Sequence, residues 1–272
     1  MAIVAMSPTL GSLGEEIGRT LAQERDWGFA DQEIIMEAAG RFGEPATELA
    51  HVTEEKPSLW ERWTDSQRRY LTFIEAILWE MAERDNMVLC GRGAAFALGK
   101  VRHALRVRVT ASERTRARRV EHQQGLTAEA AQQIVHQSDR ERSARLRFLY
   151  QIDWNDPIHY ELVLNTERMD AAEGSRLVSD ALTLQRLQPT AESLAEVRDW
   201  SLAARAQATL LCDPSTKEVH VLVNARQGYL TVSGMVDQEA QRKAVEAVVA
   251  QIPGVIRVLN ETVVISRSRA GL

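Results

Sequence analysis

The first eighteen residues constrain the fold of this chain more than any other segment. Ala2 to Met6 form a short apolar run typical of a buried strand, and Ser7 to Gly14 carry the proline and glycines of a tight loop. Glu15 to Gly18 are then expected to begin a helix. Backbone N–H groups at a helix N-terminus point towards an anion, and the helix dipole favours negative charge there. This order of elements therefore predicts an anion-binding loop at the edge of a sheet.

The loop departs from the phosphate-binding pattern G-x-x-x-x-G-K-[ST] at each of its defined positions. In the alignment, Pro8 and Leu13 stand at the two glycines, Gly14 at the lysine and Glu15 at the hydroxyl residue. In phosphoryl-transfer sites the lysine neutralises phosphate charge and the hydroxyl holds Mg²⁺. Here Glu15 and Glu16 add negative charge instead. The residues therefore predict weak phosphoryl transfer, or none, unless arginines replace the lysine.

Bulk composition narrows the class of protein. A chain of 272 residues has room for two domains, and 44% hydrophobic residues are enough for a core in each. No apolar run approaches the roughly 18 residues of a membrane span, and no signal peptide is recognisable, so we expect a cytoplasmic protein. The formal net charge of -5 does not indicate a nucleic-acid partner. Cys90 and Cys212 lie far apart without a metal-like spacing, and both are expected to be small buried side chains.

Strands and helices alternate through the first part of the chain. This alternation predicts an α/β domain over residues 1–187, with a parallel sheet covered by helices on both faces. After residues 2–6, strands are expected at 27–30, 87–90, 104–109 and 160–165, and helices at 31–40, 64–86, 111–124, 127–150 and 171–184. Residues 42–57 are expected to form a loop or irregular arm.

A second domain, with a different order of helices and strands, is predicted after a linker and helix start at residues 188–198. Over residues 199–267 we expect the rest of a helix that starts near 191, a hairpin with strands at 219–223 and 229–233, a helix capped by Asp237, and a strand at 255–265. The order helix, two strands, helix and one strand predicts a small α+β domain.

Six motifs of the first domain together resemble the cytidylate kinase-like family of P-loop nucleoside monophosphate kinases. They are Gly11-Ser12-Leu13-Gly14, Phe29–Ile35, Val88–Ala94, Asp139–Arg142, Asp153-Trp154 and Tyr160–Asn165. The resemblance spans roughly residues 1 to 185. It implies a P-loop NTPase-like fold that binds a nucleotide or another phosphorylated ligand. If the protein is an enzyme, the resemblance implies transfer of the γ-phosphoryl group of ATP to CMP or dCMP, with Mg²⁺; no cofactor is otherwise expected.

The resemblance also assigns candidate site residues. The nucleotide or phosphate would contact Gly11, Ser12, Leu13, Gly14, Asp31, Arg92 and Arg140, and Arg142 and Arg145 would be catalytic if phosphoryl transfer occurs. Simpler interpretations stay open for several of these positions. Asp31 also fits the N-cap of a helix, Arg92 fits a structural ion pair, and the arginines from 140 onwards fit a solvated helix face. Arg114, Arg116, Arg118 and Arg119 are expected to form an exposed basic face, and the six histidines show no metal spacing.

Residues from about 199 to 265 resemble a BON domain, a small interaction module. The resemblance lies in Leu230–Gly234, Pro253-Gly254-Val255 and Val258-Leu259-Asn260. We therefore expect a regulatory or sensory protein with a degenerate kinase-like domain, a pseudokinase, and a protein partner for the second domain. An active monophosphate kinase is the first alternative, and a purely structural interaction protein is the second.

An apolar stripe predicts a homodimer. Leu71, Ile74, Leu78 and Met81 fall at helical spacing, and three tryptophans at positions 60, 63 and 79 add apolar surface nearby. This is more apolar surface than one domain is expected to bury.

Overall fold

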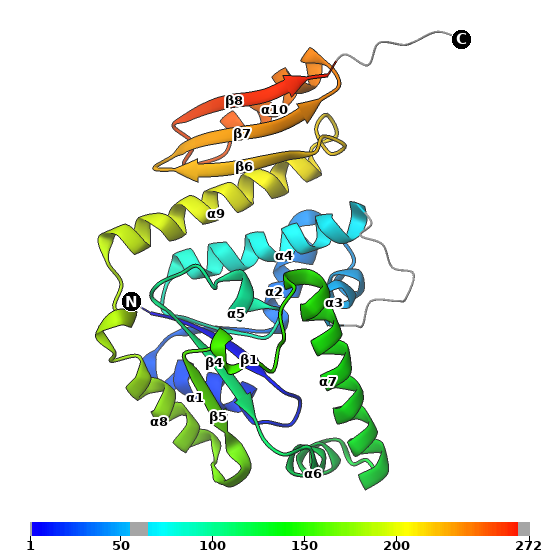
Figure 1. Cartoon of the computed structure of the whole chain (residues 1–272), viewed down its shortest axis with the longest axis vertical. Helices are drawn as coiled ribbons and strands as arrows, with labels where there is room; N and C mark the ends of the chain where they lie inside the picture. The colour runs from blue at the N-terminus through cyan, green and yellow to red at the C-terminus, as the bar shows by residue number, and fades with distance from the viewer. Residues whose placement is uncertain (1, 55–64, 266–272) are drawn as a thin grey trace. The chain divides into compact units, whose positions relative to one another are not determined.

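The computed structural model describes residues 2–54 and 65–265 (Figure 1). The chain divides into two compact units, with the division between Thr190 and Ala191. In the described residues the first unit holds a five-stranded sheet and the second a three-stranded sheet. The α/β class predicted from alternating strands and helices is confirmed for the first unit.

The elements of the first unit follow one another in a repeated strand-and-helix order. They are β1 (Ile3–Pro8), α1 (Gly14–Arg25), β2 (Gly28–Ala30), α2 (Gln32–Phe42), α3 (Ala46–Glu54), α4 (Asp65–Arg84), β3 (Met87–Cys90), α5 (Ala94–Ala97), β4 (Ala104–Thr110), α6 (Glu113–Gln124), α7 (Ala128–Tyr150), η1 (Pro157–His159), β5 (Leu162–Asn165), η2 (Thr166–Arg168), α8 (Ala171–Ala181) and η3 (Gln185–Leu187).

The central position of β1 determines where the predicted loop lies. All strand pairs are parallel, and the order is β2-β3-β1-β4-β5. Residues Ile3 to Met6 have no exposed surface, as the apolar run predicts. Because parallel strands end at one edge of a sheet, the carboxyl ends of β1, β3 and β4 lie side by side. Met6 pairs with Cys90, and Ser7 pairs with Arg108.

Helices cover both faces of this sheet. On one face α1 packs against α8, and the contact is close: a Cβ atom added to Gly174 would lie 2.6 Å from Cδ1 of Ile17. Figure 1 shows α4 and α5 across the sheet from α1 and α8. The core between the sheet and α1 includes Val4, Met6 and Leu21. This layered packing fixes the start of α1 relative to the end of β1.

The prediction of an irregular arm at 42–57 is wrong for residues 46–54, which form α3. This helix has few apolar residues, so its sequence lacks a clear stripe. Tertiary packing stabilises it instead, because Leu49 is fully buried and α3 contacts α2, α4 and α7. Residues 55–57 lie outside the described part of the chain.

The apolar stripe of α4 is buried. Ile74 and Leu78 have no exposed surface, and Met81 and Trp79 are 3% and 9% exposed. Trp60 and Trp63 lie outside the described residues. The stripe therefore serves the core of one chain, and the homodimer stays a prediction without support from this surface.

The second unit has its own core and topology. It comprises α9 (Ala191–Cys212), β6 (Val221–Arg226), β7 (Tyr229–Val236), α10 (Glu239–Ala250) and β8 (Arg257–Val264). β6 and β7 form the predicted antiparallel hairpin, and β8 pairs with β7 in parallel. Gln227 and Gly228 make the turn with φ values of 51° and 80°. The predicted order of helix, two strands, helix and strand is confirmed.

Two local predictions need correction. Gln238, rather than Asp237, is the N-cap of α10, where it forms a capping box with Gln241. Cys90 is buried as expected, whereas Cys212 is exposed at the end of α9.

Of the helices in the described ranges, none has the length and apolar character that a membrane span needs.

Glu75 on α4 gives a test of the packing in the first unit. Burial raises the pKa of Glu75, while a hydrogen bond from the Tyr150 hydroxyl, 3.3 Å from Oε1, lowers it in part. A carboxyl group with a raised folded-state pKa stabilises the fold at low pH, and this contribution is lost as the pH rises through that pKa. We expect Glu75→Gln to raise the free energy of unfolding at about pH 8 and to change it little at about pH 4.

Urea unfolding at both pH values measures this difference. Glu83→Gln, at an exposed position of the same helix, is the matched control and should have little effect at either pH. An equal change in stability for Glu75→Gln at both pH values would contradict the assignment.

Candidate functional site

The loop between β1 and α1 has the backbone of an anion-binding loop. Gly11 and Leu13 adopt left-handed conformations, with φ values of 75° and 64°, and α1 begins directly at Gly14. No side chain caps the N-terminus of α1. The amides of the first turn of α1 are therefore available to a phosphate or to water. Ser12 is fully buried and its backbone N–H donates to Thr9 O at 3.1 Å, so Ser12 shapes the loop rather than contacting a ligand.

Side chains from outside the loop hold four of its carbonyl groups. The bonds run from Arg142 Nη1 to Pro8 O (2.8 Å), from Arg116 Nη1 to Leu10 O (3.3 Å), from Arg119 Nη1 to Gly11 O (3.2 Å) and from Thr166 Oγ1 to Ser12 O (2.8 Å). Three of the four donors are guanidinium groups. The loop is thereby held in one conformation before any ligand binds, which reduces the ordering cost of binding.

This arrangement corrects the prediction of an exposed basic face on α6. Arg116 is 5% exposed and forms an ion pair with Asp139, with nitrogen–oxygen distances of 2.6 and 3.1 Å. Arg119 also donates to both oxygens of Thr166. Only Arg114 and Arg118 are exposed. Arg116 and Arg119 therefore stabilise the loop through hydrogen bonds to its carbonyl groups.

Pro8 occupies the space that a side chain at position 14 would need. A Cβ atom added to Gly14 would lie 2.4 Å from Cβ of Pro8 and 3.2 Å from Cβ of Val109. Real Cβ atoms do not approach others so closely, so a lysine at position 14 is incompatible with Pro8 in this backbone. The two departures from G-x-x-x-x-G-K-[ST] are therefore coupled. A proline at the first glycine position requires a glycine at the lysine position.

The residues at the usual metal position also differ. Glu15 replaces the hydroxyl residue, and its carboxylate forms an ion pair with Arg19 at 2.8 Å. Glu16 accepts a hydrogen bond from Gln123. The ion pair reduces the repulsion that Glu15 was expected to exert on a phosphate. Even so, Gly14 and Glu15 do not fit the arrangement in which a lysine and a hydroxyl hold ATP and Mg²⁺.

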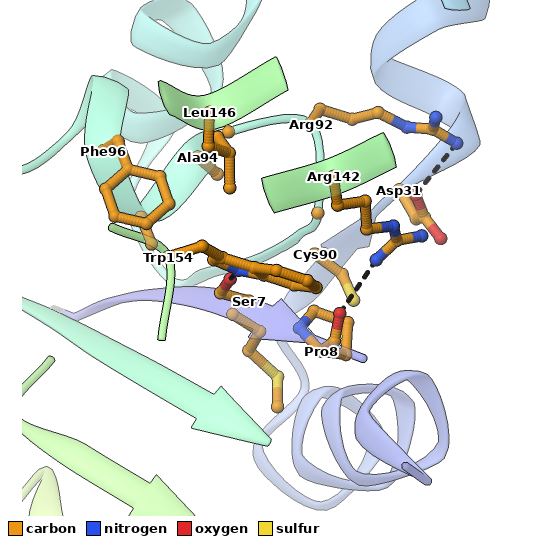
Figure 2. Close-up of a pocket in the computed structure, with 14 residues that line it drawn as sticks. Ser7, Pro8, Asp31, Cys90, Arg92, Ala94, Phe96, Arg142, Leu146 and Trp154 are labelled. Carbon is orange, nitrogen blue, oxygen red and sulfur yellow. Dashed lines mark hydrogen bonds and ion pairs between the residues drawn. The ribbon is translucent and has the colours of Figure 1, made fainter. Parts of the chain in front are cut away.

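A small cavity lies beside the loop, where β1 and β3 end (Figure 2). Its volume is about 60 Å³, and its walls include Asp31, Arg92, Arg142 and Trp154. Figure 2 shows Arg142 reaching from α7 across the cavity to the carbonyl of Pro8. Ligand pockets usually have about 300 Å³ or more. A nucleotide would therefore have to displace Arg142 from Pro8.

Arg92 and Asp31 form an ion pair on the far side of this cavity. Their side chains are 3.2 Å apart, and that of Arg92 is only 7% exposed. Gly91, Arg92 and Gly93 all adopt left-handed backbone conformations and form a turn at the end of β3. Asp31 is the N-cap residue of α2, as predicted, but its side chain makes no capping hydrogen bond. The carboxylate instead pairs with Arg92.

Trp154 lines the cavity and Arg108 packs against it, and neither was predicted as a site residue. Nε1 of Trp154 donates to Oγ of Ser7 at 2.7 Å, and the guanidinium of Arg108 lies 3.7 Å from the centre of the indole ring. Burial lowers the pKa of Arg108 to about 10. An arginine inside the apolar strand 104–109 was a sequence signal for such a buried cation. Its partners, however, come from distant segments.

The candidate arginines of α7 do not converge on one point. Arg142 lies at the cavity beside the loop. Arg145 is fully buried, with its guanidinium 6.0 Å from the ring of Phe148, and does not line the cavity. Arg140 lines another hollow on α7. Of the three, only Arg142 is placed to meet a ligand bound at the loop.

A five-stranded parallel sheet with an anion-binding loop after its central strand defines a kinase-like P-loop domain. Residues 3–168 match the sequence pattern of the cytidylate kinase-like family, and the chain belongs to that family. It is 28% identical over 166 residues to a cytidylate kinase from Methanopyrus kandleri. The aligned segment covers 57% of this chain and 80% of the relative.

Among solved structures, one similar structure shares the fold of this chain. An uncharacterised protein from Eubacterium ventriosum superposes with a TM-score of 0.53 and 16% identity, over 67% of this chain and 98% of the other.

The contact between Pro8 and Gly14 predicts strong coupling between substitutions. Gly14→Lys alone should lower the free energy of unfolding by about 1–3 kcal/mol through overpacking. In a Pro8→Gly background the same substitution should cost less than half as much, because the clashing Cβ atom is gone. Urea denaturation of both single variants and the double variant measures the coupling energy. Equal costs in the two backgrounds would rule out the steric explanation.

Proposed function

We propose that residues 1–187 bind a nucleotide or another phosphorylated ligand and catalyse phosphoryl transfer weakly or not at all. The observation that carries this proposal is the contact between Pro8 and Gly14, which leaves no room for a lysine beside an otherwise ordered anion-binding loop. A backbone of this shape binds a phosphate through amides alone. Transfer of a phosphoryl group also requires positive charge at the transferring phosphate.

The nearby arginines support binding more than catalysis. Arg116 forms an ion pair with Asp139, and Arg92 forms one with Asp31. Arg119 donates to the backbone oxygens of Gly11 and Thr166. Arg142 differs, because its guanidinium group donates to the neutral carbonyl of Pro8. In our proposal Arg142 exchanges this carbonyl for a phosphate oxygen of the ligand. A hydrogen bond between two charged groups is stronger than one to a neutral carbonyl, so the exchange is favourable.

An active nucleoside monophosphate kinase acting on CMP or dCMP is the alternative. It is favoured by the similarity to the Methanopyrus kandleri cytidylate kinase and by the position of Arg142 at the loop. In that case Arg142 would supply the charge that Gly14 lacks. Arg140 and Arg145 would need a movement of α7 to assist it, because neither lines the cavity.

We further propose that residues 199–267 form a BON-like interaction module, joined through residues 188–198, with a protein partner. A separate compact unit with its own three-stranded sheet supports this assignment. Together the two parts would make a regulatory or sensory protein in the cytoplasm, in which ligand binding by the first unit serves a signal rather than a reaction. A homodimer is part of this proposal, and light scattering at micromolar concentration tests it.

An assay of ATP with CMP and dCMP separates the two functions. We expect turnover far below about 1 s⁻¹, the lower end for kinases. Turnover at or above that rate would establish the alternative.

Ligand binding depends on Arg142 in this account. Loss of a charge-assisted hydrogen bond costs about 1.5–3 kcal/mol, so Arg142→Ala should weaken CMP binding about 10- to 150-fold in calorimetry. Arg114→Ala removes an exposed arginine of α6 and is the matched control, with little expected effect. Unchanged CMP affinity in Arg142→Ala would remove Arg142 from the site, and absence of CMP and ATP binding by the unaltered protein would favour a purely structural role.

A further inference from the structure

A second hollow lies on another face of α7. Its volume is about 410 Å³, and it is lined by His136, Asp139, Arg140, Ser143, Ala144, Arg147 and Asn155. An α-helix turns once in 3.6 residues, so Arg140, Ser143 and Arg147 lie about a third of a turn from Arg142 and Leu146, which face the first cavity. The two hollows are therefore separate sites on one helix.

The lining of this hollow carries uncompensated positive charge. In residues 2–54 and 65–265, neither Arg140 nor Arg147 has an ion-pair partner, and both are exposed. The acid in the lining, Asp139, is neutralised by Arg116. His136 lies 3.9 Å from Glu113, which is outside the lining. Two guanidinium groups thus face the same space without a carboxylate to balance them.

A buried cation behind the wall adds to this charge. Arg108 is 5% exposed and donates to Ser7 O and to Oδ1 of Asn155, both at 3.3 Å. Its hydrogen-bond partners are neutral, and the carboxylate that acts on it electrostatically, Asp139, is paired with Arg116. A buried charge of this kind is costly unless an opposite charge lies near. Because Oδ1 of Asn155 accepts from Arg108, the amide NH₂ of Asn155 is left to donate into the hollow.

We propose that this hollow is a second anion site, which binds a ligand carrying two or more phosphate groups. Arg140 and Arg147 are seven residues apart, about 10 Å along the helix axis, which suits an oligophosphate better than a single phosphate. Ser143 and Asn155 supply neutral donors between the two guanidinium groups. The site is independent of the loop, so it does not require the function proposed for the first cavity.

Calorimetry of the full chain with inorganic tripolyphosphate tests the proposal. We expect saturable binding that Arg140→Gln/Arg147→Gln weakens at least about tenfold. The matched control Arg114→Gln/Arg118→Gln removes the same charge from exposed positions of α6 and should weaken binding less than about threefold. Inorganic phosphate should bind much more weakly than tripolyphosphate.

Three outcomes would overturn the proposal. The first is no binding of tripolyphosphate by the unaltered protein at millimolar concentration. The second is an equal loss in both double variants, which would indicate non-specific attraction. The third is a loss in Arg142→Ala as large as in Arg140→Gln/Arg147→Gln, which would place the ligand in the first cavity. Titration with ATP then separates the sources: if Arg140→Gln/Arg147→Gln weakens ATP binding as much as tripolyphosphate binding, the hollow also holds the phosphates of a nucleotide, and if only tripolyphosphate binding is weakened, the hollow recognises free oligophosphate.

Discussion

The contact between Pro8 and Gly14 excludes a lysine side chain from the loop of the first unit. Pro8 ends the central strand, and the start of α1 is held so close to it that no side chain fits at position 14. The strand and helix packing that fixes this distance is the framework of the entire unit. A loop that keeps its amides but excludes a lysine can bind an anion more readily than it can stabilise the extra charge of a transferring phosphoryl group. Under the function we propose, binding without efficient transfer would follow from this geometry as well as from one missing charge.

Two arginines of α6 stabilise the loop instead of forming the exposed basic face that the sequence predicted. Arg116 and Arg119 donate to loop carbonyls, and their charge supports the loop from outside. Arg142 joins α7 to the loop through its hydrogen bond to Pro8 O. The hollow of Arg140 and Arg147 lies on the same helix.

The sequence predicted the strands and most helices of both units because apolar periodicity reports which face of an element is buried. α3 was missed because its polar composition hides a single buried anchor, Leu49, whose burial depends on three other helices. At the site, the alignment identified Gly14 and Pro8 as departures, and Arg142 was a candidate. Their contact, the pairing of Asp31 with Arg92 and the role of Arg108 all join residues distant in the chain. Local patterns do not contain such pairings.

The most direct test of the central claim is a nuclear magnetic resonance titration of the backbone amides with CMP and ATP, with and without Mg²⁺. The account predicts that the amides of residues 11–16 shift on saturation with a nucleotide, that Mg²⁺ changes these shifts little, and that no phosphoryl transfer product accumulates. Shifts that require Mg²⁺ and accompany steady formation of CDP would contradict it, because the loop would then be seating a metal-bound triphosphate for catalysis.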